Sequence, residues 1–218
     1  MSERESVDRF VLERRLLARG CRIIAGVDEA GRGPLAGPVV AAEVVFPAAT
    51  IAAGLPPELA GLNDSKQLTP QSREQFFAAL TSCPGLRFAV AQVGPADIDR
   101  LNILRATHQA MNEALAQLSP PPEHALVDGL RAPSLRFAHT AVVRGDSLSF
   151  SIAAASVIAK VTRDRLMAAY DRLYPVYGFA QHKGYGTPDH LAALAKHGPC
   201  PLHRRSFAPL KLAQGELF

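Results

Sequence analysis

The sequence has too few cysteines for a disulfide framework, and their spacing does not fit a zinc site. Cys21, Cys83 and Cys200 are an odd number, and no two of them form a C-x-x-C pair. The seven histidines show neither H-E-x-x-H nor another zinc spacing. We therefore expect reduced thiols, which are typical of the cytoplasm, and no zinc centre.

The sequence also lacks a long apolar run, a signal-peptide pattern and an internal repeat. A membrane-spanning helix needs about 20 consecutive apolar residues, and no stretch of the chain meets that requirement. Hydrophobic residues make up 48% and charged residues 20% of the 218 residues, which is a globular rather than a disordered composition. We expect a cytoplasmic protein with a full core, as one large domain or as a domain with an appendage.

The most informative stretch covers residues 23–34, where an apolar run meets two acids and a glycine-rich turn. Asp28 and Glu29 follow the run, and Gly31, Arg32 and Gly33 come next. The run predicts a buried strand over about 22–28, and the glycines predict that it stops or bends there. Arg32 alone cannot neutralise two acids at the end of a core strand, so a bound cation is the leading hypothesis. The alternative is a salt-bridged loop.

A nucleotide fold is a second alternative, because Gly31, Gly33 and Ala36 fit the loose pattern G-x-G-x-x-G/A. That fingerprint requires a helix to begin inside it. Here Gly37-Pro38 leads into another strand-like run, and the two acids would repel a pyrophosphate. We reject this alternative.

Hydrophobic periodicity predicts an α/β protein with alternating helices and strands. We expect strands over about 22–28, 38–46, 86–93, 125–129 and 138–143, the first two paired as a hairpin-like unit. We expect helices over about 5–19, 70–81 and 95–117, one long helix from 147 to beyond 160, and one after Thr187-Pro188, with loops over 47–62 and 181–186. The candidate boundary near 170–180 gives a core over 1–175 and a C-terminal helical and basic segment over 176–218.

Acids beside glycines recur at the ends of the predicted strands. Asp28 and Glu29 follow the first strand, Asp128 the fourth, and Asp146 comes after the fifth. Taken singly, Asp128 is compatible with a turn and Asp146 with a helix cap. If these strands lie side by side in the same direction, four carboxylates converge, and unpaired they would repel one another. Mg²⁺ and Mn²⁺ prefer oxygen ligands and would relieve that repulsion.

Two such ions, held about 3.5–4 Å apart by carboxylates, are the usual arrangement for phosphodiester hydrolysis. The formal net charge of +4 suits a polyanionic partner, although many enzymes with neutral substrates share it. Because the chain has no Gly-rich phosphate loop, a polymeric phosphodiester fits better than a free nucleotide.

Six segments, in order along residues 22–209, resemble the ribonuclease HII family. They are G-V-D-E-A-G-R-G-P-L-A-G-P-V, N-D-S-K-x-L, V-D-G, G-D-S-x-S-x-S-I-A-A-A-S-V-I-A-K-V-T-R-D, H-K-G-Y-G-T and H-R-R-S-F. The resemblance implies an RNase H-like α/β core, with a mixed central sheet of about five strands flanked by helices, and a C-terminal helical segment. It also implies an endonuclease that cuts the RNA strand of RNA–DNA hybrids, and 5′ of single ribonucleotides in duplex DNA, leaving 3′-hydroxyl and 5′-phosphate ends.

By the same resemblance, the family's four catalytic and metal-binding acids fall on Asp28, Glu29, Asp128 and Asp146, which would hold two Mg²⁺ or Mn²⁺ ions. One departure from the family is Arg144 before Gly145-Asp146, where lysine is common; the charge is retained. The early position of Asp28 argues against the related ribonuclease HIII, which has a long N-terminal extension.

The resemblance also assigns substrate contacts. Gly31, Arg32 and Gly33 fall on the element that reads the ribonucleotide 2′-hydroxyl and the neighbouring phosphates, and glycines allow the close approach this needs. Tyr185 falls on the tyrosine that senses the RNA–DNA junction; the alternative is a structural tyrosine. Lys66 would meet a phosphate, with a solvated lysine as the alternative. Lys183 and Arg204 are weaker phosphate-contact candidates.

Two other function classes remain to be tested against this hypothesis: a non-catalytic duplex-binding module, and a nuclease of the same fold that acts on DNA alone. We expect a monomer that works in ribonucleotide excision repair. Residues 212–218 resemble a Gln-x-x-Leu-Phe tail that binds a sliding clamp, and the alternative is a disordered end.

Overall fold

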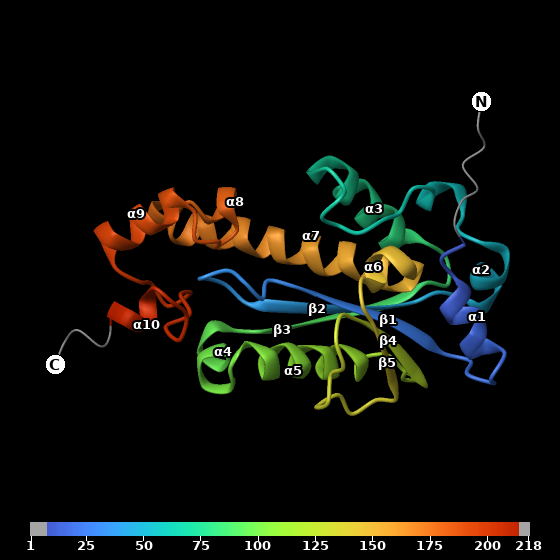
Figure 1. The fold of residues 1–218 in the computed structure, drawn as a ribbon. Coiled ribbons are helices and arrows are strands. Elements are labelled where there is room, and N and C mark those ends of the chain that lie inside the picture. The colour runs from blue at the N-terminus through green and yellow to red at the C-terminus, as the bar shows by residue number, and fades with distance from the viewer. Residues whose placement is uncertain (1–7, 214–218) are drawn as a thin grey trace.

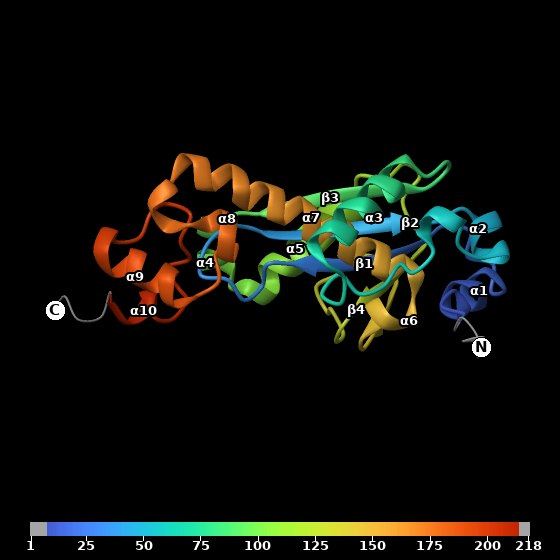
Figure 2. The same ribbon diagram turned by 90° about the horizontal axis from the view of Figure 1, so that it is seen from above.

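A mixed five-stranded sheet lies at the centre of the computed structural model, which describes residues 8–213 (Figures 1 and 2). Its order is β3-β2-β1-β4-β5. The strands are β1 (Ile24–Ala30), β2 (Val39–Val45), β3 (Arg87–Val93), β4 (His124–Asp128) and β5 (His139–Val142). The α-helices are α1 (Val11–Leu17), α2 (Ala48–Ala53), α3 (Pro70–Ser82), α4 (Pro95–Leu101), α5 (Ile103–Leu115), α6 (Gly145–Leu148), α7 (Phe150–Leu173), α8 (Phe179–His182), α9 (Pro188–His197) and α10 (Leu210–Ala213), and the 3₁₀-helices are η1 (Pro57–Leu59) and η2 (Pro175–Tyr177).

The strand directions bring the carboxyl ends of β1 and β4 together. β1 pairs antiparallel with β2, and β2 antiparallel with β3, whereas β1, β4 and β5 run parallel. The predicted hairpin-like unit and the mixed five-stranded sheet are therefore confirmed. Pairing between β1 and β4 ends at Val27 with Val127. Asp28 and Asp128 come next on their strands, at the same edge of the sheet.

Helices cover both faces of the sheet, α7 on one side and α5 on the other (Figure 1). The first turns of α7 are rich in alanine and fully buried, which lets the helix lie close to β1. At the contact, a Cβ built on Gly26 would stand 2.1 Å from the main-chain carbon of Ser151, so no larger residue fits there. This close approach fixes α7 relative to the carboxyl end of β1.

Several predicted boundaries were wrong. β1 continues to Ala30 because its pairing with β2 extends to Ala30 with Val40, so Asp28 and Glu29 lie inside the strand rather than at its end. The stretch 47–62, predicted as a loop, contains α2 and η1, which bury Ile51 and Leu59 in the core. The stretch 181–186, predicted as a loop, begins with the last two residues of α8.

Two predicted long helices are each divided by a capping residue. Asn102 has a φ of 72°, which ends α4, and its side chain accepts a hydrogen bond from the Arg105 amide to begin α5. Ser149 has an extended backbone between α6 and α7 and accepts from the Ile152 amide. Asn and Ser side chains form these local hydrogen bonds with the backbone. Hydrophobic periodicity does not reveal such bonds, so the two breaks were not predicted.

The two ends of the described chain lie at opposite ends of the molecule. The N-terminal helix predicted over about 5–19 is present as the shorter α1 (Val11–Leu17), and residues 5–7 of that prediction lie outside the described part. The C-terminal helices α8 and α9 follow α7 (Figure 2). None of the helices within residues 8–213 has both the length and the apolar character that crossing a membrane requires.

Candidate active site

Three of the four predicted acids meet at the carboxyl edge of the sheet. One carboxylate oxygen from each of Asp28, Asp128 and Asp146 lies within 4.8 Å of the others. Asp28 comes from β1, Asp128 ends β4, and Asp146 lies in α6, so strands and a helix distant in sequence build the group. Main-chain amides fix two of them: Glu29 donates to Asp28 Oδ1 at 2.7 Å, and Gly145 donates to Asp128 Oδ1 at 2.7 Å.

The acids are held in an environment that opposes their ionisation. Burial, followed by the negative charges of Glu29 and Asp128, raises the pKa of Asp28 well above its ordinary value. Burial and the charge of Asp128 also raise the pKa of Asp146. Carboxylates in such a cluster repel one another unless a cation joins them.

The donor set fits a hard divalent cation. It consists of carboxylate oxygens with no cysteine or histidine, and Mg²⁺ and Mn²⁺ favour such ligands. Lys66 Nζ lies 4.0 Å from Asp146 Oδ2, but its side chain is 77% exposed. One exposed ammonium does not compensate three clustered acids, of which Asp28 and Asp146 are buried and Asp128 is half-buried. Divalent metal use therefore follows from the chemistry of the cluster.

Glu29 lies next to this group but outside it. Neighbouring residues of a strand point to opposite faces, and Glu29 forms an ion pair with Arg32 at 3.2 Å. Burial raises the pKa of Glu29, against the opposing charge of Arg32. The structure thus brings together Asp28, Asp128 and Asp146, and places Glu29 between them and the Gly31–Gly33 loop.

A cleft of about 380 Å³ adjoins the acids and gathers the other predicted contact residues. Its lining includes Glu29, Gly31, Arg32, Gly33, Lys66, Ser156, Lys160 and Tyr185. Arg32 and Tyr185 both line the cleft and are well exposed, so a ligand in the cleft can reach them. Segments near residues 30, 65, 160 and 185 therefore line one cleft.

The two glycines of the loop have different surroundings. Gly31 has a φ of 96°, and a Cβ there would stand 2.0 Å from Arg163 Nε. The backbone conformation and the packing of the protein therefore require glycine at this position. A Cβ on Gly33 would meet only Tyr185 Cε1, at an ordinary 3.7 Å. Nothing within the described part of the chain requires glycine at 33, which leaves a small open surface beside an exposed aromatic ring.

The prediction that Arg204 contacts a phosphate was wrong. Its side chain is 0% exposed, and it donates to the main-chain oxygens of Gly31, Arg32 and Gly37 instead. Burial and the nearby Arg163 guanidinium lower the pKa of Arg204 to about 9, which still leaves it charged at neutral pH. Lys183 donates to the main-chain oxygen of Ala180, at 2.6 Å.

Sequence reasoning missed residues that support the site from behind. Ser156 of α7 hydrogen-bonds Ser65 at 2.7 Å, and its hydrogen bond to Asp28 opposes the rise in the pKa of that acid. Arg9 donates to the main-chain oxygens of Leu62 and Asp146, joining two loops that carry site residues. Ser156 lies within the segment that begins G-D-S and resembles the family, so that motif could have identified it. Arg9 precedes every matched motif and carried no signal.

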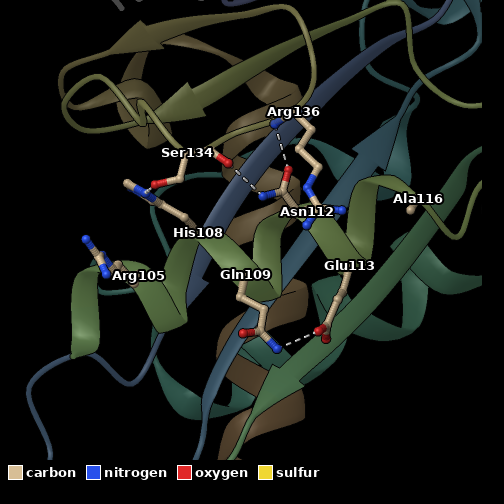
Figure 3. Close-up of a pocket in the computed structure, with 8 residues that line it drawn as sticks. All are labelled: Arg105, His108, Gln109, Asn112, Glu113, Ala116, Ser134 and Arg136. Carbon is tan, nitrogen blue, oxygen red and sulfur yellow. Dashed lines mark hydrogen bonds between the residues drawn. The ribbon is translucent and has the colours of Figure 1, made fainter. Parts of the chain in front are cut away.

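A larger cavity, of about 620 Å³, lies away from the acids between α5 and the loop after β4 (Figure 3). Asn112 ties the two walls together, donating to Ser134 and accepting from the Arg136 amide. Arg105 and Arg136 line it, and Glu113 is hydrogen-bonded to Gln109. Its lining contains no cluster of acids, so we place the chemistry in the smaller cleft.

Comparisons with known proteins identify the family. The family model described as Ribonuclease HII matches residues 25–210. The ribonuclease HII of Geobacter sulfurreducens is 54% identical over 207 residues, covering 94% of this chain and 90% of the relative. That of Geobacillus kaustophilus is 54% identical over 199 residues, covering 91% of this chain and 73% of the relative.

Solved structures show the same fold. Ribonuclease H2 from Pyrococcus horikoshii OT3 has a TM-score of 0.72 at 28% identity, covering 89% of this chain and 98% of its own. RNase HII of Archaeoglobus fulgidus, solved in complex with PCNA, has a TM-score of 0.69 at 25% identity, covering 84% and 93%. Bst-RNase HIII in complex with Mn²⁺ has a TM-score of 0.66 at 19% identity, covering 98% and 74%, which bears on the fold alone. The chain therefore belongs to the ribonuclease HII family and is a ribonuclease H.

Proposed function

We propose that this ribonuclease H hydrolyses the RNA strand of RNA–DNA hybrids and cuts duplex DNA on the 5′ side of a single embedded ribonucleotide. The products would carry 3′-hydroxyl and 5′-phosphate ends. The observation that supports this most is the meeting of Asp28, Asp128 and Asp146 beside the cleft that contains Arg32, Gly33 and Tyr185. In such an arrangement a phosphodiester-cleaving centre would lie next to a surface that selects its substrate.

In the proposed mechanism Asp28, Asp128 and Asp146 would hold the metal, with Glu29 at the margin of the group. Two bound Mg²⁺ or Mn²⁺ ions would supply an activated water for in-line attack and stabilisation of the leaving oxygen. The protein's own contribution is to fix the carboxylates in advance, through the amides of Glu29 and Gly145. Lys66, beside Asp146, would contact a phosphate of the substrate.

Selection of the ribonucleotide would depend on Gly31, Arg32, Gly33 and Tyr185. The 2′-hydroxyl is the group that distinguishes RNA from DNA at a given position, and reading it requires close contact. The absence of a side chain at Gly33 allows the backbone to approach the sugar. The exposed ring of Tyr185 lies alongside, where it can stack on the deoxyribose that follows.

The test is cleavage of a DNA duplex that contains one ribonucleotide, with Mn²⁺ or Mg²⁺ and then with EDTA. We expect metal-dependent cutting 5′ of the ribonucleotide and none of an all-DNA control. Equal cutting of the control would indicate a nuclease of the same fold that acts on DNA. Tight binding without cutting would indicate a non-catalytic duplex-binding module. Either result would contradict the proposal.

We also propose that the protein works as a monomer in the cytoplasm, in ribonucleotide excision repair. Its three cysteines are free thiols, which suits a reducing compartment. We further propose that the C-terminal tail contacts a sliding clamp, because the Archaeoglobus fulgidus relative was solved in complex with PCNA. The tail motif, Gln214–Phe218, lies outside the described residues. Deleting 214–218 should abolish clamp-stimulated cleavage but leave cleavage without the clamp unchanged, and retained stimulation would contradict the contact.

A further inference from the structure

Two arginine side chains are buried against the loop between β1 and β2, where neither forms an ion pair with any acid that the structure describes. Arg163 is 1% exposed and Arg204 is 0% exposed. Among the ion pairs of residues 8–213, none includes either arginine. Burying a charge is costly unless it is paired or hydrogen-bonded, so the protein must compensate these two cations in another way.

Main-chain carbonyl groups provide that compensation. Arg204 donates to the oxygens of Gly31 at 2.6 Å, of Arg32 at 3.0 Å, and of Gly37 at 2.8 and 2.9 Å. All of these acceptors lie in the loop between β1 and β2. The guanidinium therefore holds the first two residues of the predicted 2′-hydroxyl-reading element, and Gly37 further along the same loop, through their backbone oxygens rather than through side chains.

Arg163 joins the same loop to the tyrosine loop. Its guanidinium donates to the oxygens of Ala36 and Pro38 and, at 3.0 Å, to the oxygen of Lys183, two residues before Tyr185. The two loops also bond directly, because the Leu35 amide donates to Gly184 at 2.8 Å. One side chain of α7 thus links two segments about 150 residues apart in the sequence.

The loops fit around these side chains without spare room. A Cβ on Gly31 would stand 2.0 Å from Arg163 Nε, and one on Gly184 would stand 2.5 Å from the main-chain oxygen of Ala36. A planar guanidinium with several fixed donors suits this geometry, and a lysine ammonium cannot reproduce it. The fit leaves the loops little freedom to move separately.

We propose that Arg163 and Arg204 are positioning residues that hold the Gly31–Gly33 loop and the Tyr185 loop as one preformed unit. Recognition of the ribonucleotide then depends on both arginines, whereas metal binding by the aspartates does not. The inference rests on the proposed function for the role it gives the two loops. It assigns to Arg204 a function in the protein interior in place of a phosphate contact.

The test compares Arg163→Lys and Arg204→Lys with two matched controls. Arg165→Lys and Arg205→Lys change exposed arginines close by in sequence. For the buried pair we expect the KM for a single-ribonucleotide duplex to rise about tenfold or more, with kcat and Mn²⁺ affinity changed less than about threefold. The controls should match the wild type. An unchanged KM in folded variants, or parallel losses of kcat and Mn²⁺ affinity, would overturn the proposal.

A measurement on the wild-type protein decides the matter even if the variants fail to fold. Native-state hydrogen exchange in low urea should show amides of 31–38, 183–186 and 203–205 opening together, with one free energy and one urea dependence. Clearly different openings for these segments would overturn the proposal. Because this readout needs no substrate, it remains informative if the wild type does not cleave the duplex, an outcome that would refute the proposed function instead.

Discussion

Replacing Glu43 by glutamine is expected to stabilise the protein at neutral pH and to change its stability little near pH 4. Glu43 lies in β2, opposite Val27, and is 0% exposed. Its neighbours on that face of the strand, such as Ala41 and Val45, pack in the same apolar cluster as Met111 of α5. Neither carboxylate oxygen has a hydrogen-bond partner within the described residues.

The size of the effect follows from the pKa of this side chain. Burial raises the pKa of Glu43 from 4.5 to about 8, against a smaller opposing effect of Arg87. The native state therefore keeps a proton that the unfolded chain releases, and stability falls as the pH rises from about 4.5 to about 8. At about 1.4 kcal/mol per pH unit, the loss by pH 7 is about 3 kcal/mol. Glutamine is similar in shape and does not ionise, so the variant should avoid this loss.

Urea unfolding of both proteins between pH 4 and pH 8 measures the effect, with Glu58→Gln as a matched control on the surface. At pH 7 the gain should correspond to a rise in Tm of roughly 6–12 °C for a domain of this size. The curves should converge toward pH 4, and the control should follow the wild type throughout. Parallel curves for wild type and Glu43→Gln, or a variant less stable at pH 7, would refute the reasoning.

Three further predictions concern the site and its support. Asp28→Asn should nearly abolish turnover while the metal-free protein melts at the same or a higher temperature, because a like charge is removed; a fully active variant would remove the proposed site. Gly33→Ala should melt within about 2 °C of the wild type but have a higher KM. Gly31→Ala should lose more than about 2 kcal/mol of stability, because its Cβ would meet a buried guanidinium. Equal melting temperatures for the two variants would contradict this prediction. Burial lowers the pKa of His203 to about 4, so stability should fall by at most about 3 kcal/mol as the pH drops from about 6.5 to about 4, and His203→Asn should flatten this part of the curve in urea unfolding.

The strands and most of the helices could be predicted because their hydrophobic periodicity is strong. β2, β3 and α3 were predicted within one residue at each end. The ends of β1 could not be predicted, because its last residues are held by pairing with β2, a contact that local sequence does not encode. Asn102 and Ser149, which divide the predicted long helices, act through single side-chain caps.

The candidate site was predictable to the extent that its residues form linear motifs. Asp28 belongs to an acidic pair before a glycine-rich turn, Asp128 and Asp146 each stand beside a glycine, and the fold brings the three together. Glu29 lies next to them on β1 and pairs with Arg32. The role of Arg204 could not be predicted, because a basic motif has the same appearance whether its arginine faces solvent or lies buried against carbonyl groups.

The central claim is that aspartates from distant parts of the chain form one binding site for a divalent cation. Calorimetric titration of Mn²⁺ into the wild type and into Asp28→Asn, Asp128→Asn and Asp146→Asn tests it most directly, with Asp189→Asn of the exposed side of α9 as the control. We predict that each of the three substitutions weakens Mn²⁺ binding at least tenfold in folded protein, and that the control binds like the wild type. Wild-type affinity in any one of the three would contradict a shared site.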